Sequence, residues 1–232
     1  MKQYISMIDN VPLFEGINAD DLVRSLTCLS AQVIPVHQGQ VILRQGDPAV
    51  KLGVVLRGGA HVMTGDEQGN HTIIAVIHEK ELFGDTFACA GVQALPSSVV
   101  AAQDGLVLLL EHERVITGCR QGCMAHSRLV TNLLRAIAGK NLKLNQKLNI
   151  VTQKTTREKL YAYLLVQQNM AGTARFRIPF DRQKLADYLG VERSAMSAEL
   201  GKMKRAGLID YWKNEFELLR PLSEARGEAH HG

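Results

Sequence analysis

The sequence has few of the features that mark secreted, membrane-spanning or disulfide-stabilised proteins. It holds only four cysteines, Cys28, Cys89, Cys119 and Cys123, with no regular spacing. We therefore expect reduced thiols and a cytoplasmic location. The apolar runs, such as residues 107–110, are far shorter than the roughly eighteen residues that would span a bilayer, so we expect no membrane partner. No basic stretch followed by an apolar stretch opens the chain, and we expect no secretory signal.

Motifs of the common enzyme classes are also missing. The sequence has no nucleophile elbow, no phosphate-binding loop, no metal-ligand spacing and no paired-carboxylate pattern. We therefore expect neither an enzymatic activity nor a metal site. The composition, with 46% hydrophobic and 22% charged residues, excludes disordered and fibrous classes, and 232 residues suit two domains of ordinary size.

Charge divides the chain into two halves. Residues 1–118 contain 7 Lys and Arg against 13 Asp and Glu, whereas residues 119–232 contain 20 against 10. A basic half joined to an acidic half is typical of a polyanion-binding module attached to a module with another task.

The first half has the pattern of an antiparallel β-sandwich or barrel. Short aliphatic segments recur between glycine-rich turns, which is the spacing of strands in such folds. The predicted strands are residues 33–36, 40–43, 52–56, 60–63, 72–77 and 107–110. A short capped helix is predicted before them, over residues 18–26.

A long helix is predicted over residues 124–152, because no proline occurs between residues 97 and 178. Its apolar positions recur at alternating steps of three and four, which favours pairing with a second helix in a homodimer. The predicted seam is Val130, Leu134, Ile137, Asn141, Leu144, Leu148 and Val151. A single Asn in such a seam fixes register and favours two strands. The alternative is a helix that packs on its own domain, with Asn141 hydrated.

The last third predicts a small α/β module. It consists of a helix over residues 155–168, a strand over 175–180, two helices over 181–189 and 192–206, and a hairpin over 207–212 and 215–219. The two short helices have the pattern of a helix-turn-helix. Asp181 can cap the first helix, and Gly190 supplies the positive φ of the turn.

The apolar residues of this motif separate its two faces. The side chains expected in the core are Leu185, Ala186, Leu189, Val191, Met196 and Leu200. The second helix can then enter the major groove with its outward side chains. The predicted DNA-binding residues are Arg193, Ser194, Ser197, Ala198, Gln183, Lys184, Lys202, Lys204 and Arg205. Among them, Arg193 is the candidate for base readout, and the lysines and Arg205 are candidates for phosphate contacts.

Three stretches carry a resemblance to a known family. These are Val-Pro-Leu-Phe at residues 11–14, Glu-Leu-Phe-Gly-Asp at 81–85, and the helix-turn-helix at 185–209. Over residues 11–220 the chain resembles the CRP/FNR family of transcription regulators. The resemblance implies an α+β fold with a jelly-roll, cyclic-nucleotide-binding-like effector domain (1–118) and a dimerisation helix (119–153). A winged helix-turn-helix domain (154–222) and a flexible tail (223–232) follow.

The resemblance also implies a function. We expect a homodimeric, sequence-specific regulator that binds an inverted repeat in double-stranded promoter DNA, works with RNA polymerase, and responds to an unidentified small effector. Two alternatives stay open. One is a cyclic-nucleotide-type regulatory protein without a DNA role, and the other is a haem-based or thiol-based redox or gas sensor of the same family.

The effector turn departs from that of cyclic-AMP receptors. Pro96 stands where the resemblance expects the arginine that grips the cyclic phosphate, so cyclic AMP is not expected. Glu81 and Asp85 disfavour small anions unless Lys143 reaches into the site, so a neutral, cationic or metal-centred ligand fits better than a phosphate. The predicted effector-binding residues are Glu81, Phe83, Gly84, Asp85, Thr86, Ser97, Ser98, Asn141 and Leu142.

The known sensor chemistries of the family find little support in this sequence. Only Cys28 lies where iron–sulfur members carry a cluster of cysteines, and residues 83–86 offer neither Cys nor His to a haem. Cys119 and Cys123 are inert buried thiols, a redox pair or a site for a soft metal. In the recognition helix Arg193 matches the family's guanine-reading arginine, but Ser194 and Ala198 stand where a glutamate and a second arginine are expected. The operators of the better-known subgroups therefore do not carry over.

Overall fold

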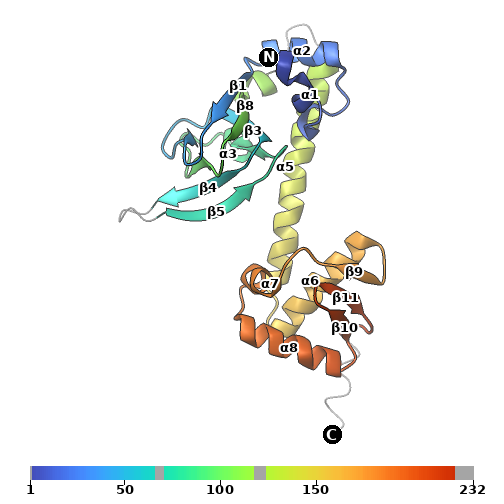
Figure 1. Ribbon diagram of the computed structural model, residues 1–232. Helices are drawn as coiled ribbons and strands as arrows, with labels where there is room; N and C mark the ends of the chain where they lie inside the picture. Colours follow the sequence, from blue (N-terminus) through green and yellow to red (C-terminus); the bar gives the residue numbers. More distant parts are fainter. Residues whose placement is uncertain (1, 66–70, 118–123, 223–232) are drawn as a thin grey trace. The chain divides into compact units, whose positions relative to one another are not determined.

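The computed structural model describes residues 2–65, 71–117 and 124–222 (Figure 1). Two compact units make up the chain, Met1–Lys140 and Asn141–Gly232. The division falls inside the long helix α5 (Met124–Val151), so that one continuous helix belongs in part to each unit. The predicted boundary at residue 118, the two cysteines at 119 and 123, and the tail 223–232 lie outside the described residues. Within the described ranges, no helix combines the length and the apolarity needed to cross a bilayer.

The first unit contains a sandwich of two four-stranded antiparallel sheets. The strand orders are β1-β8-β3-β6 and β2-β7-β4-β5. The strands are β1 (Gln32–Val36), β2 (Val41–Leu43), β3 (Lys51–Arg57), β4 (Ala60–Gly65), β5 (His71–Ile77), β6 (Leu82–Phe83), β7 (Ser98–Ala101) and β8 (Gly105–Glu111). The six predicted strands all form, and the predicted sandwich is confirmed. The prediction missed β6, which has only two residues, and β7, which has four.

Strand β8 explains why the most apolar run of the sequence shows no alternation. Both faces of β8 are buried. Leu106, Leu108 and Leu110 join a core that also contains side chains of the helices, whereas Val107 and Leu109 join the core between the two sheets. A strand that is covered on both faces has no solvent side, so every position is apolar.

Short helices cover one face of this sandwich (Figure 1). They are α1 (Ile5–Ile8), α2 (Ala19–Cys28), α3 (Asp85–Cys89) and α4 (His112–Ile116), with 3₁₀ turns at η1 (Lys2–Tyr4) and η2 (Pro12–Phe14). The predicted cap of α2 is confirmed, since the Asn18 side chain accepts a hydrogen bond from the backbone N–H of Asp21.

Helix α5 carries two apolar faces. On one face Ala125, Leu129 and Leu133 are buried in the core of the first unit. The other face includes Leu144 and Leu148 of the predicted seam, whose exposed fractions are 58% and 48%. Ile137 of the predicted seam is half-buried against the core of the first unit, so at this position the alternative of a helix packed on its own domain holds. Ala125, Leu129 and Leu133 were not predicted as a buried face.

Asn132 attaches α5 to the N-terminal segment. This side chain is 5% exposed, and its Nδ2 donates to the carbonyl oxygens of Leu13 at 3.1 Å and Glu15 at 2.9 Å. A buried amide with satisfied donors stabilises the packing of the two segments, and its loss leaves those carbonyls without this partner.

The second unit has the predicted α/β order. Its elements are α6 (Thr156–Ala171), β9 (Arg175–Arg177), α7 (Arg182–Leu189), α8 (Arg193–Arg205), β10 (Ile209–Trp212) and β11 (Glu215–Leu218), and the sheet order is β10-β11-β9. Thr155 and Glu158 form a capping box that starts α6. Ile150, near the end of α5, is buried in the core of this unit.

We predict that Asn132→Ala lowers the free energy of unfolding by about 1–3 kcal/mol, because two buried hydrogen bonds are lost. Asn149→Ala is the matched control, since Asn149 lies in the same helix with an exposed side chain. Urea unfolding followed by circular dichroism at one protein concentration measures both. Equal midpoints for the two variants would contradict the role given to Asn132.

Candidate nucleic-acid interface and effector turn

Side-chain caps and a glycine fix the helix-turn-helix. Asp181 Oδ1 accepts a hydrogen bond from the backbone N–H of Lys184 at 2.8 Å, which starts α7. The helix ends at Gly190, whose φ of +62° is favourable for glycine. Both features were predicted from the sequence and are confirmed.

Glu192 caps the following helix, α8. Its carboxylate accepts hydrogen bonds from the backbone N–H groups of Ser194 and Ala195, at 2.9 and 2.8 Å, and from the Ser194 hydroxyl. The Ser194 hydroxyl, followed by the backbone donors, lowers the pKa of Glu192 to about 2. A carboxylate that stays ionised at the N-terminus of a helix also interacts favourably with the helix dipole.

The buried faces of α7 and α8 share one core. Leu185, Ala186 and Leu189 of α7 are buried there with Met196 and Leu200 of α8, as predicted. Val191, between the helices, is half-buried against the same core. A small Ala186 in this core allows a close approach of the two helices.

All nine predicted DNA-binding residues are exposed, but four of them have side-chain partners. The Ser194 hydroxyl bonds Glu192, and the Gln183 amide donates to Asp187 at 2.8 Å. Lys204 lies 2.6 Å from Asp210, and Lys202 lies 3.7 Å from Glu199. The pair at Lys204 also lowers the pKa of Asp210, which a backbone hydrogen bond lowers further.

The other five predicted residues have no side-chain hydrogen bond or ion pair to the described parts of the chain. Their side chains are therefore available to an external partner. They are Lys184, Arg193, Ser197, Ala198 and Arg205.

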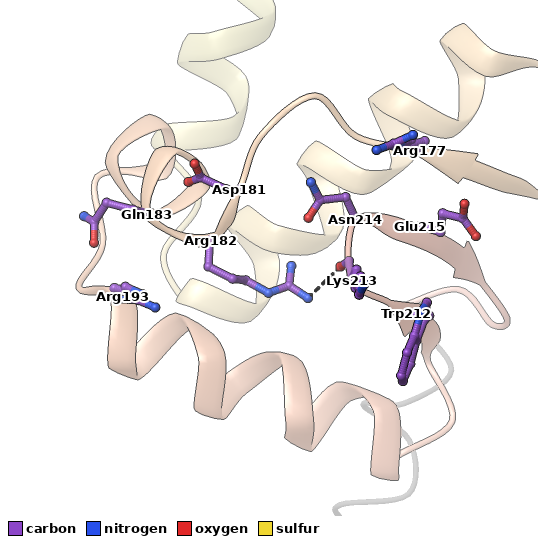
Figure 2. A pocket seen from close by; sticks show the side chains of 9 residues that line it. All are labelled: Arg177, Asp181, Arg182, Gln183, Arg193, Trp212, Lys213, Asn214 and Glu215. Carbon is purple, nitrogen blue, oxygen red and sulfur yellow. Dashed lines mark hydrogen bonds between the residues drawn. The ribbon is translucent and has the colours of Figure 1, made fainter.

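An open pocket of about 720 Å³ lies between the start of α7, the start of α8 and the turn between β10 and β11 (Figure 2). It is lined by Arg177, Asp181, Arg182, Gln183, Arg193, Trp212, Lys213, Asn214 and Glu215. Four of these side chains are cationic and two are anionic. The sequence analysis named only Gln183 and Arg193 of this set as DNA-binding, although the basic charge of this half was visible.

Arg182 connects the two sides of the pocket. Figure 2 shows it reaching from the start of α7 to the carbonyl oxygen of Lys213, to which its Nη2 donates at 3.0 Å. The guanidinium lies over the rings of Tyr211 and Phe216, at 5.0 and 5.2 Å from their centroids. Burial lowers the pKa of Arg182. Trp212, which also lines the pocket, is 74% exposed.

In the first unit, the predicted effector turn is built by packing and backbone geometry. Phe83 is 3% exposed and its ring lies over Gly53, where any Cβ would collide with it. Gly84 has φ +72°, and a Cβ there would come within 2.8 Å of the Lys51 carbonyl oxygen. These two residues shape the turn and offer no polar side chain to a ligand.

The polar residues predicted to bind the effector differ in their exposure and in their hydrogen-bond partners. Glu81 is exposed and its Oε2 accepts from the backbone N–H of His78, which closes its own turn. Ser98 Oγ accepts from the backbone N–H of Gln45 at 2.9 Å. Ser97 is buried and Thr86 is exposed. Asn141 and Leu142 belong to the second unit and are exposed. Their contribution to an effector site stays a prediction.

Asp85 is the buried charge of this turn. It is 1% exposed, and its Oδ1 lies 2.6 Å from the Lys140 ammonium, which also donates to the Leu82 carbonyl oxygen at 2.9 Å. Burial, and secondly the charge of Asp85, raise the pKa of the Cys89 thiol, while Lys140 lowers it. The sequence analysis missed Lys140, because a contact between residues 55 positions apart leaves no local pattern.

No metal site is evident in the described part of the chain. Within residues 2–65, 71–117 and 124–222, no three His, Cys, Asp or Glu side chains gather in a way that could hold an ion. His126 is buried, and its Nε2 lies 2.8 Å from the Val115 carbonyl oxygen.

Comparisons with known proteins agree with this layout. The family described as Cyclic nucleotide-binding domain matches residues 33–121, and the Crp-like helix-turn-helix domain matches residues 158–222. Together they cover more than half of the chain.

Two curated relatives and one solved structure are similar over most of the chain. Electron transport regulator A of Shewanella oneidensis is 24% identical over 76% of this chain and 70% of that protein. Transcriptional activator protein anr of Pseudomonas aeruginosa is 23% identical over 80% of this chain and 75% of that protein. The solved structure of the c-di-GMP responsive global regulator CLP of Xanthomonas campestris has a TM-score of 0.52 at 14% identity, covering 86% of this chain and 100% of that one, which supports the fold alone. With the fold, the capped recognition helix and both domain matches in agreement, the chain belongs to the CRP/FNR family and is a DNA-binding transcriptional regulator with an effector-binding β-roll.

Proposed function

We propose that the protein acts as a homodimer that binds an inverted-repeat operator through α8 and is controlled by a small effector bound in the β-roll. The observation that carries the proposal is the exposed face of α8, where Arg193 and Ser197 have no side-chain partner among the described residues while the opposite face is buried. A rigid helix with short polar residues and an arginine on one face is suited to the major groove.

Base readout is assigned to the first turns of α8. Arg193 lies at the first position of this helix, where helix-turn-helix proteins contact base edges. Phosphate contacts are assigned to Lys184 and Arg205, which are exposed and carry no ion pair to the described residues. Lys202 and Lys204 fit this role less well, because each is close to a carboxylate of its own unit.

The dimer interface is assigned to the second apolar face of α5. Leu134, Leu144 and Leu148 are between 48% and 63% exposed and repeat at heptad positions with Asn141. Asn141 Oδ1 accepts from Asn145 Nδ2 at 2.6 Å, and its own amide N–H groups have no acceptor among the described residues, so they can bond a second copy. A two-fold dimer presents its recognition helices about one turn of DNA apart, which calls for an inverted repeat.

The remaining assignments follow from this role. A regulator of this kind is expected to work with RNA polymerase at the promoter and to have no catalytic activity of its own. Its DNA partner and the free thiols of Cys28 and Cys89 agree with a reducing cytoplasm.

The effector is unidentified. Cyclic AMP is not expected, because Pro96 removes the guanidinium that would pair with its phosphate. Haem remains the alternative.

We predict that Arg193→Ala weakens operator binding by about 1–3 kcal/mol and relaxes the preference at one base pair in each half-site. Lys184→Ala is the comparison, because loss of a phosphate contact lowers the slope of log K against log salt by about one and acts on all sequences alike. Fluorescence anisotropy with an operator selected from random DNA measures both. Unchanged affinity and an unchanged preferred site in Arg193→Ala would remove Arg193 from base readout.

We predict that the double variant Leu144→Asp, Leu148→Asp is a monomer. Four like charges would meet in the paired seam, and the cost of desolvation and repulsion exceeds the gain from the contacts that they replace. Sedimentation at micromolar concentration measures the state. Gln146→Asp, Asn149→Asp adds the same charge to exposed positions off the seam and should leave the dimer intact. A dimeric seam variant would mean that the interface lies elsewhere.

We predict that cyclic AMP and cyclic GMP show no saturable binding at micromolar concentration, since the site lacks a bidentate phosphate partner at Pro96. Isothermal calorimetry up to millimolar nucleotide is the direct measurement. Micromolar binding that also strengthens operator affinity would restore cyclic nucleotides as the effector.

A further inference from the structure

The effector turn and the long helix are connected by one ion pair. Lys140 Nζ lies 2.6 Å from Asp85 Oδ1 and donates to the Leu82 carbonyl oxygen at 2.9 Å. Leu82 lies in β6 and Asp85 is the first residue of α3, so the two acceptors flank the turn at Gly84. No other cation of the described residues forms an ion pair with Asp85.

This pair differs from an ordinary surface salt bridge. The Asp85 side chain is 1% exposed, whereas that of Lys140 is 43% exposed. A carboxylate removed from water needs a partner to remain charged, and leaving it alone is costly. Its second oxygen, Oδ2, is buried and has no hydrogen-bond partner among the described residues. The site is therefore held by a single cation and keeps one acceptor unused.

Lys140 lies in α5 at the division between the two units. Lys140 is the last residue of the first unit, and α5 continues without interruption into Asn141. Lys140 lies within the assigned dimer seam: Leu134 precedes it, and Asn141, Leu144 and Leu148 follow within eight positions. A change in the contacts of Lys140 therefore acts on α5 in the middle of the seam.

We propose that Lys140 is the positioning residue that couples the effector turn to the dimerisation helix. This inference rests on the proposed function. An effector that supplies an anionic group for Lys140, or a cationic group for Asp85, competes with the pair. The attachment of α5 to the effector turn then depends on whether the effector is bound. The effector favours either the paired or the unpaired state of Lys140 and Asp85, according to its difference in affinity for the two states. The opposing view is that the pair only tethers the helix and adds stability.

The test is a double-mutant cycle in the full-length protein with operator affinity as the readout. The variants are Lys140→Met, Asp85→Asn and the double variant, and the operator is the duplex selected from random DNA by the parent protein. If the pair couples the sites, both single variants change the dissociation constant about tenfold or more in one direction, within the usual 5–150-fold range of allosteric coupling. The double variant matches the single variants instead of adding them, because either change breaks the same contact.

Two further variants separate coupling from loss of fold. Lys140→Arg keeps the charge and should stay close to the parent, even if Lys140→Met unfolds. Arg135→Met removes a cation from an exposed position of the same helix with no ion pair to the described residues, and should leave DNA affinity unchanged. Circular dichroism and sedimentation confirm folding and assembly of each variant.

The outcomes are distinct. A lower unfolding midpoint with unchanged operator affinity in folded pair variants would overturn the proposal and leave a structural tether. Equal effects of Arg135→Met and Lys140→Met would also overturn it. If the parent protein itself fails to bind any duplex in a salt-dependent way, the proposed function fails and not this inference alone.

Discussion

The long helix α5 has to satisfy two different partners, and much of the structure depends on how it does so. One face, with Leu129 and Leu133, completes the core of the first unit, and Ile150 near its end completes the core of the second. The same helix leaves a second apolar face in solvent. An exposed apolar stripe of this length is costly in a monomer and is typical of a surface that another helix covers. The sequence of α5 therefore has to meet two requirements at once: one face packs in the cores of the units, and the other face is suited to pairing with a second helix.

The second unit solves another problem, which is to present a short helix rigidly enough to read bases. Buried Met196 and Leu200 fix one face of α8, Gly190 sets its direction, and Glu192 satisfies the free N–H groups of its first turn. The cap engages the Ser194 hydroxyl, which is then less available to an external partner. Arg193 is consequently the better-placed polar group in the first turn.

Features encoded in consecutive residues were predicted from the sequence, and features that depend on distant contacts were not. The caps at Asn18 and Asp181, the turn at Gly190 and six of the eight strands in the first unit follow from local composition and periodicity. The helix face that includes Leu133 was missed because a helix with two apolar stripes shows no single clean period. The Arg182 contact with Lys213 was missed because it joins residues 31 positions apart.

The same limit changes the electrostatic argument about the effector. From the sequence, Glu81 and Asp85 count as two negative charges that repel small anions. In the structure Asp85 is paired with Lys140, and Glu81 faces its own turn, where it accepts from the backbone. The net charge offered by the turn is therefore less negative than the residue count implies, and the preference for a neutral or cationic ligand loses its basis. The prediction that cyclic AMP is not the effector does not depend on these two carboxylates, because it rests on Pro96, which offers no guanidinium to the cyclic phosphate.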